Sequence, residues 1–211
     1  MNWTSLSDRL VQFLITALLL GGIPVMAGAQ DAPFEQLKMK FEDGQIFSAD
    51  FHHQSVDSYT QDTVSNNGLI WVGNEDYKVR TDQQTVVVDG KISTVFDRNR
   101  NRVIISNYEP SEDDFAPSRI LNGIDSTFTV TEEMKQGNQF YIQLTSEDPF
   151  AIYKKVEIVL SEALIPQQIR AVDPVDNIIT TEFKNGTFLP PEEELFELDY
   201  PDSVELIDMR D

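Results

Sequence analysis

The sequence predicts a mainly β protein: a strongly curved antiparallel sheet of about ten or eleven strands, with only two short helices. The first observation is the stretch from Gly68 to Ser106, where short segments of alternating apolar and polar residues are separated by turn residues. Because side chains alternate across a strand, each of these segments has one apolar face. The second observation is Asp89-Gly90, a pair between two such segments that favours the tight turn of a β-hairpin.

The N-terminal segment has the features of a secretory signal peptide. Arg9 precedes an apolar run at Leu10–Val25, and the small residues Ala27-Gly28-Ala29 fit a cleavage site. A transmembrane anchor is the alternative. Glycine and proline residues interrupt the run before it reaches the length of a membrane-spanning helix, which argues against an anchor. We therefore expect a signal peptide at residues 1–29, with cleavage after Ala29.

The rest of the chain, residues 30–211, is long enough for a single domain with a sizeable core. The formal net charge of the whole chain is −20, and the chain contains no cysteine. A strongly acidic surface repels nucleic acid and anionic lipid headgroups, so we expect no nucleic-acid partner. Two explanations of the acidity stay open, a saline habitat or solubility on one hand and a role in function on the other.

The expected elements follow one another without a linker or an internal repeat. A short amphipathic helix is predicted at Ala32–Phe41, where Pro33 suits the first helical position. A second short helix is predicted at Phe115–Ile124, because Pro117 comes early in it and Gly123 late. Further strands are predicted at Ile46–Phe51, Tyr59–Val72, Thr127–Thr131, Phe140–Thr145, Ile152–Leu160, Gln167–Val172 and Ile178–Phe188.

Residues that could support catalysis or hold a metal are few. His52 and His53 are the only histidines. Adjacent residues of a strand point to opposite faces, so these two cannot share a metal or belong to one triad. Asp97–Arg102 resembles the start of a calcium loop but has Arg102 where the loop needs glycine. Asp173–Asn177 is likewise interpreted as a turn. We therefore expect no enzyme, no catalytic residues, no metal site and no cofactor.

The apolar side chains are the stronger functional candidates. A strongly curved sheet with two short helices has little to fill its concave side, so surplus apolar surface is expected to line a cavity suited to acyl chains. For any one of these residues, a filled core is the alternative. The candidate cavity-lining residues are Trp71, Val88, Phe96, Leu121, Ile142, Leu144, Ile158, Leu160, Ile169 and Phe183.

Three short motifs occur in a specific order along the chain. A G-x-x-W-V strand ends at Val72, a V-x-D-G-K turn ends at Lys91, and a P-x-x-I-L segment covers Pro117–Leu121. Near the end of the chain, a pair of strands is expected at Leu195–Leu198 and Val204–Asp208, on either side of Pro201. Over residues 34–211 this order and spacing resemble the LolA family of periplasmic outer-membrane lipoprotein carriers.

The resemblance implies an incomplete β-barrel whose helices cover the concave face as a lid. It also implies a monomeric periplasmic carrier that takes acylated lipoproteins from an inner-membrane exporter and passes them to an outer-membrane acceptor. The alternative is a non-enzymatic relative of the same fold, which binds another amphiphile or acts as a periplasmic lipoprotein sensor. The expected lid residues are Phe115, Ile120, Leu121 and Ile124.

The chain departs from the family pattern after its W-V strand. The resemblance implies a basic residue followed by proline at this point, with the arginine helping to hold the lid closed. Gly73–Asp76 contains neither residue. Arg80 and Arg119 are the nearest arginines in the sequence that could hold the lid closed instead, and the choice between them stays open.

Overall fold

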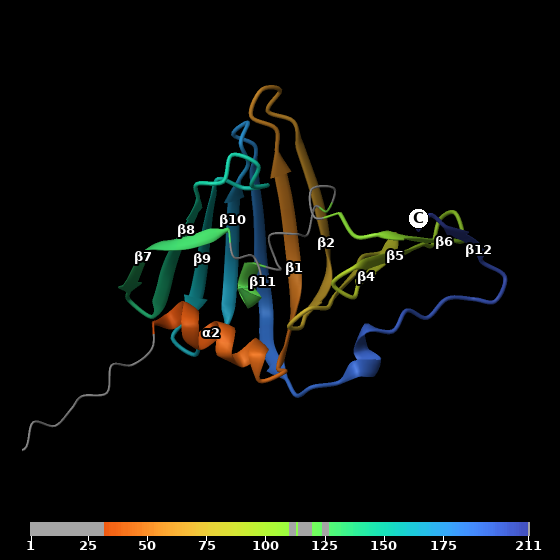
Figure 1. Cartoon of the computed structure of the whole chain (residues 1–211), viewed down its shortest axis with the longest axis horizontal. Helices are drawn as coiled ribbons and strands as arrows, with labels where there is room; N and C mark the ends of the chain where they lie inside the picture. The colour runs from red at the N-terminus through yellow and green to blue at the C-terminus, as the bar shows by residue number, and fades with distance from the viewer. Residues whose placement is uncertain (1–31, 110–112, 114–119, 124–126, 211) are drawn as a thin grey trace, which may run out of the picture. The chain divides into compact units, whose positions relative to one another are not determined.

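The described part of the chain forms one open sheet of twelve strands (Figure 1). The computed structural model describes residues 32–109, 113, 120–123 and 127–210, which belong to one compact unit, Asp31–Asp211. The strands are β1 (Ile46–Val56), β2 (Thr63–Val72), β3 (Tyr77–Arg80), β4 (Gln84–Val88), β5 (Ile92–Asp97), β6 (Arg102–Asn107), β7 (Phe128–Gln136), β8 (Gln139–Ser146), β9 (Lys155–Ser161), β10 (Pro166–Val172), β11 (Ile178–Leu189) and β12 (Glu205–Asp208).

The strand order is β12-β6-β5-β4-β3-β2-β1-β11-β10-β9-β8-β7. Within the run β1 to β6 and within the run β7 to β11, each strand pairs with its neighbour in sequence as an antiparallel hairpin, and the long-range pair β1–β11 joins the two runs. Among the described strands, β12 alone pairs in parallel, beside β6. The edge strands β7 and β12 are not paired with each other. The expected curved antiparallel sheet is thus confirmed, and it is open rather than closed into a barrel.

Helix α2 (Pro33–Glu42) crosses one face of the sheet, which we call the inner face. Near its start, the backbone N–H of Phe34 donates to the Glu133 carboxylate on β7 at 3.0 Å. Near its end, the ring of Phe41 packs edge-on against Phe188 of β11, with centroids 5.5 Å apart. Leu37 between them is fully buried. The helix predicted from the sequence is confirmed, and its apolar side lies on strands β7 to β11.

Strand register decides which side chains share the inner face. Ile142 of β8 lies opposite Ile158 of β9, which lies opposite Ile169 of β10. On the neighbouring strands, Phe51 lies opposite Phe183. These residues belong to one hydrophobic core that runs from β8 to β4. Burying one side chain of this size contributes about 1.5–3 kcal/mol, so this face provides much of the stability of the fold.

The C-terminal segment differs from the expected pair of strands. Val204–Asp208 does contain a strand, β12, but Glu193–Phe196 forms a short 3-10 helix, η3. The ammonium group of Lys78 donates to the carbonyl oxygens of Leu195 and Glu197, at 2.9 and 2.7 Å. Because a side chain satisfies these carbonyls, the segment needs no strand partner there, and the prediction of a strand at Leu195–Leu198 is wrong.

The helix predicted at Phe115–Ile124 is only partly within the described residues. Ile120–Asn122 form a short 3-10 helix, η2, followed by Gly123 with a positive φ of 70°. The expected lid residues Phe115 and Ile124 lie outside the described residues, and so does Arg119.

Candidate functional site

Most of the predicted lining residues lie together on the inner face. They are buried beneath or beside α2 and η2, in one contiguous apolar core. Their role as a lining for acyl chains stays a prediction, because in this conformation they pack against protein. The residues so placed are Val88, Ile142, Leu144, Ile158, Leu160, Ile169 and Phe183, and Leu121 of η2 belongs to the same core.

Trp71 and Phe96 lie on the opposite, outer face, so the prediction that they point inward is wrong. Trp71 pairs with Lys78, while its inner-face neighbour Ile70 pairs with Val79. The guanidinium group of Arg80 lies over the Trp71 ring, 5.5 Å from its centroid.

Phe96 is covered by the C-terminal segment instead of lining a cavity. Its ring packs against Tyr200, with centroids 6.5 Å apart. The strands themselves lie where the alternation predicts them, but alternation alone does not tell which face is inward.

The 3-10 helix η2 is tied to the sheet by both apolar and polar contacts. Ile120 and Leu121 are buried in the core. The side-chain amide of Asn122, which is also buried, donates to the carbonyl oxygens of Gly73 and Asn74, at 3.1 and 2.8 Å. Both carbonyls belong to the β2–β3 turn, where the sequence departs from the family pattern. Among described residues, the side chain that ties η2 to this turn is therefore an asparagine, whereas Arg80 stacks on the outer face.

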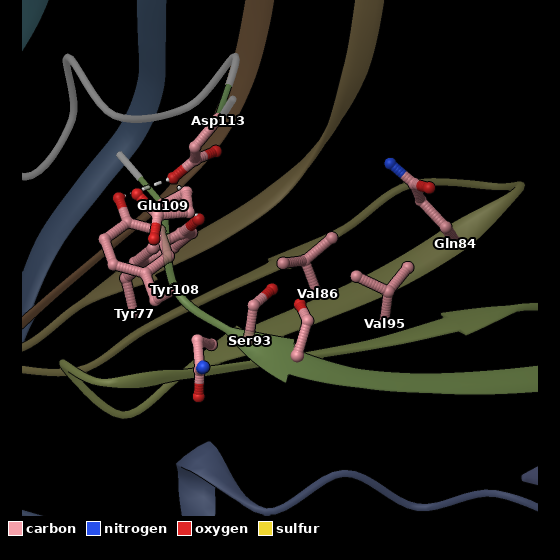
Figure 2. A pocket seen from close by; sticks show the side chains of 10 residues that line it. Tyr77, Gln84, Val86, Ser93, Val95, Tyr108, Glu109 and Asp113 are labelled. Carbon is pink, nitrogen blue, oxygen red and sulfur yellow. Dashed lines mark hydrogen bonds between the residues drawn. The ribbon is translucent and has the colours of Figure 1, made fainter. Parts of the chain in front are cut away.

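A cavity of about 210 Å³ lies at the inner face of strands β3 to β6 (Figure 2). Val86 and Val95 give it an apolar floor, and Figure 2 shows the ring of Tyr77 close to that of Tyr108 at one end. The described lining consists of Tyr77, Gln84, Val86, Ser93, Val95, Ser106, Asn107, Tyr108, Glu109 and Asp113.

Hydrogen bonds fix the aromatic end of this cavity. The hydroxyl groups of Tyr77 and Tyr108 both donate to Oδ2 of Asp113, the latter at 2.8 Å. The two rings meet edge-on, with centroids 6.3 Å apart. Hydrogen bonds to an ionised acceptor are roughly twice as strong as neutral ones, so this arrangement holds Tyr108 and Asp113 against Tyr77 of β3.

Sequence reasoning misses this cluster. The alternation identifies Tyr77 as a strand residue, but Asp113 stands in an acidic stretch that indicates only a loop. No local pattern signals that its carboxylate meets the phenol of Tyr77 on β3 as well as that of the nearby Tyr108.

The two histidines and the turn at Asp173 make hydrogen bonds within the fold. His53 is buried on the inner face, with Nδ1 3.0 Å from the Thr181 hydroxyl, whereas the ring of His52 meets Asn67 at 2.6 Å on the other face. The Asp173 carboxylate accepts hydrogen bonds from backbone N–H groups within its own turn. In the described residues, no group of three or more His, Cys, Asp or Glu side chains is placed to hold a metal ion. The absence of catalysis stays a prediction.

None of the described helices has the length and apolar character needed to cross a membrane. The predicted signal peptide lies outside the described residues. Export and cleavage therefore stay predictions.

Solved structures from bacteria are similar to this chain. An uncharacterized conserved protein from Thermus thermophilus matches with a TM-score of 0.52 and 10% sequence identity, over 82% of this chain and 98% of that chain. A LolA superfamily protein from Nitrosomonas europaea matches with a TM-score of 0.46 and 12% identity, over 80% and 97% of the two chains.

Sequence comparison identifies the family. No curated protein matches the chain. The family model described as outer membrane lipoprotein carrier protein LolA, however, matches residues 42–199, which is most of the chain and all strands from β1 to β11. The chain therefore belongs to the LolA family of outer membrane lipoprotein carrier proteins.

Proposed function

We propose that this protein is a periplasmic carrier that shelters the acyl chains of lipoproteins against the inner face of its sheet. It takes its cargo from an inner-membrane exporter and delivers it to an outer-membrane acceptor, as a monomer and without a chemical step. Exposing an acyl chain to water costs about 0.8 kcal/mol per CH₂ group, so passage through an aqueous compartment requires such a shelter.

One observation supports this proposal above the others: the apolar inner face is covered by two small separate elements. Helix α2 and the 3-10 helix η2 cover a core that extends over strands β8 to β4. Neither element is part of the sheet, so each has the freedom to move while the strand pairing stays intact. A sheet that opens in this way offers its buried residues to a ligand without unfolding.

The size of the cavity indicates that loading requires such a movement. Its volume of about 210 Å³ lies below the roughly 300–1,000 Å³ of sites for drug-sized ligands. We therefore expect an acyl chain to need further apolar surface of the inner face, part of which lies under the buried residues of η2. The two hydrogen bonds of Asn122 to the β2–β3 turn oppose this movement, at about 1 kcal/mol each.

Binding of a fluorescent fatty-acid probe tests the proposal. The mature protein is expected to bind the probe, and an acylated lipoprotein is expected to displace it. The same lipoprotein without its acyl groups is the matched control and should not compete. Equal competition by both forms would indicate recognition of the protein surface of the cargo instead.

The alternative is a member of the family that binds another amphiphile or senses lipoproteins in the periplasm. The β2–β3 turn supports this alternative, because Gly73–Asp76 lacks the arginine and proline that the family pattern implies. Mass spectrometry of the molecules that copurify with the protein distinguishes the two. Acylated lipoproteins support the carrier, and a free lipid or another amphiphile supports the alternative.

A further inference from the structure

Strands β3 to β6 carry a positive charge within an acidic chain. Residues 77–107 include six lysines and arginines but only three aspartates and no glutamate, whereas the formal net charge of the whole chain is −20. Part of this positive charge lies on the outer face, beside the rings of Trp71 and Phe96. The cations placed there are Lys78, Arg80 and Arg98.

Two of these side chains have no carboxylate partner. Each of the other described arginines forms an ion pair with an aspartate or a glutamate, namely Arg100, Arg102, Arg170 and Arg210. Among the described residues, no carboxylate pairs with Arg80 or Arg98, although the chain has 36 acidic residues and only 16 basic ones. A guanidinium group presents several N–H donors in a planar fork that matches a carboxylate.

The sheet holds both guanidinium groups in place. That of Arg80 lies over the Trp71 ring, 5.5 Å from its centroid. That of Arg98 lies 5.9 Å from the centroid of Phe96, and it donates to the Thr85 hydroxyl at 2.6 Å. Arg80 and Thr85 lie opposite each other on β3 and β4, so both arginines belong to one part of the outer face. Groups that are already ordered lose less entropy when a partner binds.

The C-terminal segment of the chain is an acidic polypeptide that already packs on this face. Residues 190–210 contain eight acidic residues and one basic residue, and they lead from β11 to the end of β12 (Figure 1). On the way, Lys78 donates to two of their backbone carbonyl oxygens, and Tyr200 packs on the Phe96 ring. No described carboxylate of the segment pairs with either of the two arginines.

We infer that the outer face of β2 to β5 docks an acidic segment of another polypeptide, whose carboxylates pair with Arg80 and Arg98. A narrow segment fits better than an anionic membrane, because the rest of this acidic chain would be repelled by an extended anionic surface. The inference goes beyond the proposed function and does not depend on it. Acyl chains are proposed to bind the inner face, so the outer face stays accessible while cargo is bound.

NMR titration of the mature protein with a glutamate-rich peptide tests this inference. The control peptide has glutamine in place of every glutamate and is otherwise identical. At 0.1 M salt the Debye length is about 10 Å, so the peptide responds to nearby cations more than to the net charge of the chain. The glutamate peptide is expected to shift the amide signals of β3 and β4, and the glutamine peptide is not.

Variants locate the binding site. Arg80→Gln and Arg98→Gln are each expected to weaken peptide binding about threefold, as for exposed ion pairs, and the double variant about tenfold. Arg80 makes no hydrogen bond through its side chain among the described residues, so its variant keeps the test valid if Arg98→Gln disturbs folding. Arg170→Gln is the matched control and should leave binding unchanged, because it removes the same charge from β10, where Arg170 pairs with Glu157.

Several results would overturn the inference. They are equal binding of the two peptides, an equal loss in Arg170→Gln and Arg80→Gln, and the absence of shifts with either peptide. Vesicles of phosphatidylglycerol provide the other comparison. If they retain the wild-type protein but not Arg80→Gln, and the peptide does not bind, the face is a membrane contact instead. None of these results affects the carrier proposal, which the fatty-acid probe tests separately.

Discussion

Some single residues of this protein are required because of a contact with a distant part of the chain, and not because of the neighbouring sequence. Leu121 is fully buried although it belongs to a 3-10 helix of three residues. Gly68 is needed because a Cβ atom there would collide with the carbonyl oxygen of Arg80. Neither requirement is visible in the residues next to them.

Leu121→Ala tests whether η2 acts as a separate lid. The truncation removes buried methyl groups, a loss of about 2–5 kcal/mol where the site cannot collapse. If η2 moves on loading, the loss falls on the closed state and the open form gains population. Probe affinity should then change more than the melting temperature. A sharp drop in melting temperature with unchanged affinity would make Leu121 an ordinary core residue.

Gly68→Ala is expected to destabilise the sheet. The added methyl group would collide with the backbone of β3 and approach the Phe51 ring at 3.0 Å. Crowding of this kind costs about 1–3 kcal/mol or more, so thermal unfolding should occur at a lower temperature. Gly137→Asn is the control, because nothing lies within 4 Å of that position and asparagine tolerates its positive φ. Equal stability of the two variants would contradict the argument.

At the scale of elements, the C-terminal segment is attached to the outer face by a few specific contacts. Lys78 bonds two of its carbonyls, and Tyr200 packs on Phe96. A Cβ on Gly73 would lie 3.1 Å from the ring of Phe196. Burial lowers the pKa of Lys78 below its usual value of 10.5, while the carboxylates of Asp199 and Glu197 oppose that shift.

Replacing this lysine tests the attachment. Lys78→Met keeps an unbranched apolar side chain and removes both hydrogen bonds, which are worth about 1.5–3 kcal/mol each for a charged donor. Hydrogen exchange of the β12 amides should accelerate, while that of β1 and β11 should not. Lys91→Met makes the same change of charge at an exposed hairpin position and serves as the control. Unchanged exchange at β12 in Lys78→Met would show that β6 alone holds it.

The sequence predicts those elements whose signals are local. Asp89-Gly90 marks the β4–β5 hairpin, and the spacing of Phe34 and Leu37 marks α2. The sides expected for Trp71 and Phe96 are wrong, because strand alternation defines two faces but not the direction of the core. The strand expected at Leu195–Leu198 does not form because a lysine distant in sequence satisfies its carbonyls.

The candidate site is harder to predict than the fold. Aliphatic residues such as Ile158 belong to the buried core of the inner face, and their role as a cavity lining stays a prediction. Asn122 and Asp113 escape prediction, because each becomes informative only through a partner elsewhere in the chain, the turn at Gly73 and the hydroxyl of Tyr77.

At the scale of the whole molecule, membership of the LolA family and an open sheet support the proposal of a carrier that works outside the cytoplasm. Export is the first expectation at this scale. N-terminal sequencing of the protein recovered from the periplasm should begin at Gln30, directly after the small residues that end at Ala29. Recovery of a chain that keeps Met1 in the membrane fraction would contradict it.

The central claim is that acyl chains lie on the inner face of the sheet. A fatty acid with a photoreactive group on its chain tests this claim most directly, because cross-linked residues are identified by mass spectrometry after proteolysis. We predict cross-links to Val88, Ile142 and Ile158 on the inner face, and none to Trp71 or Phe96 on the outer face. Cross-links confined to the outer face would contradict the account.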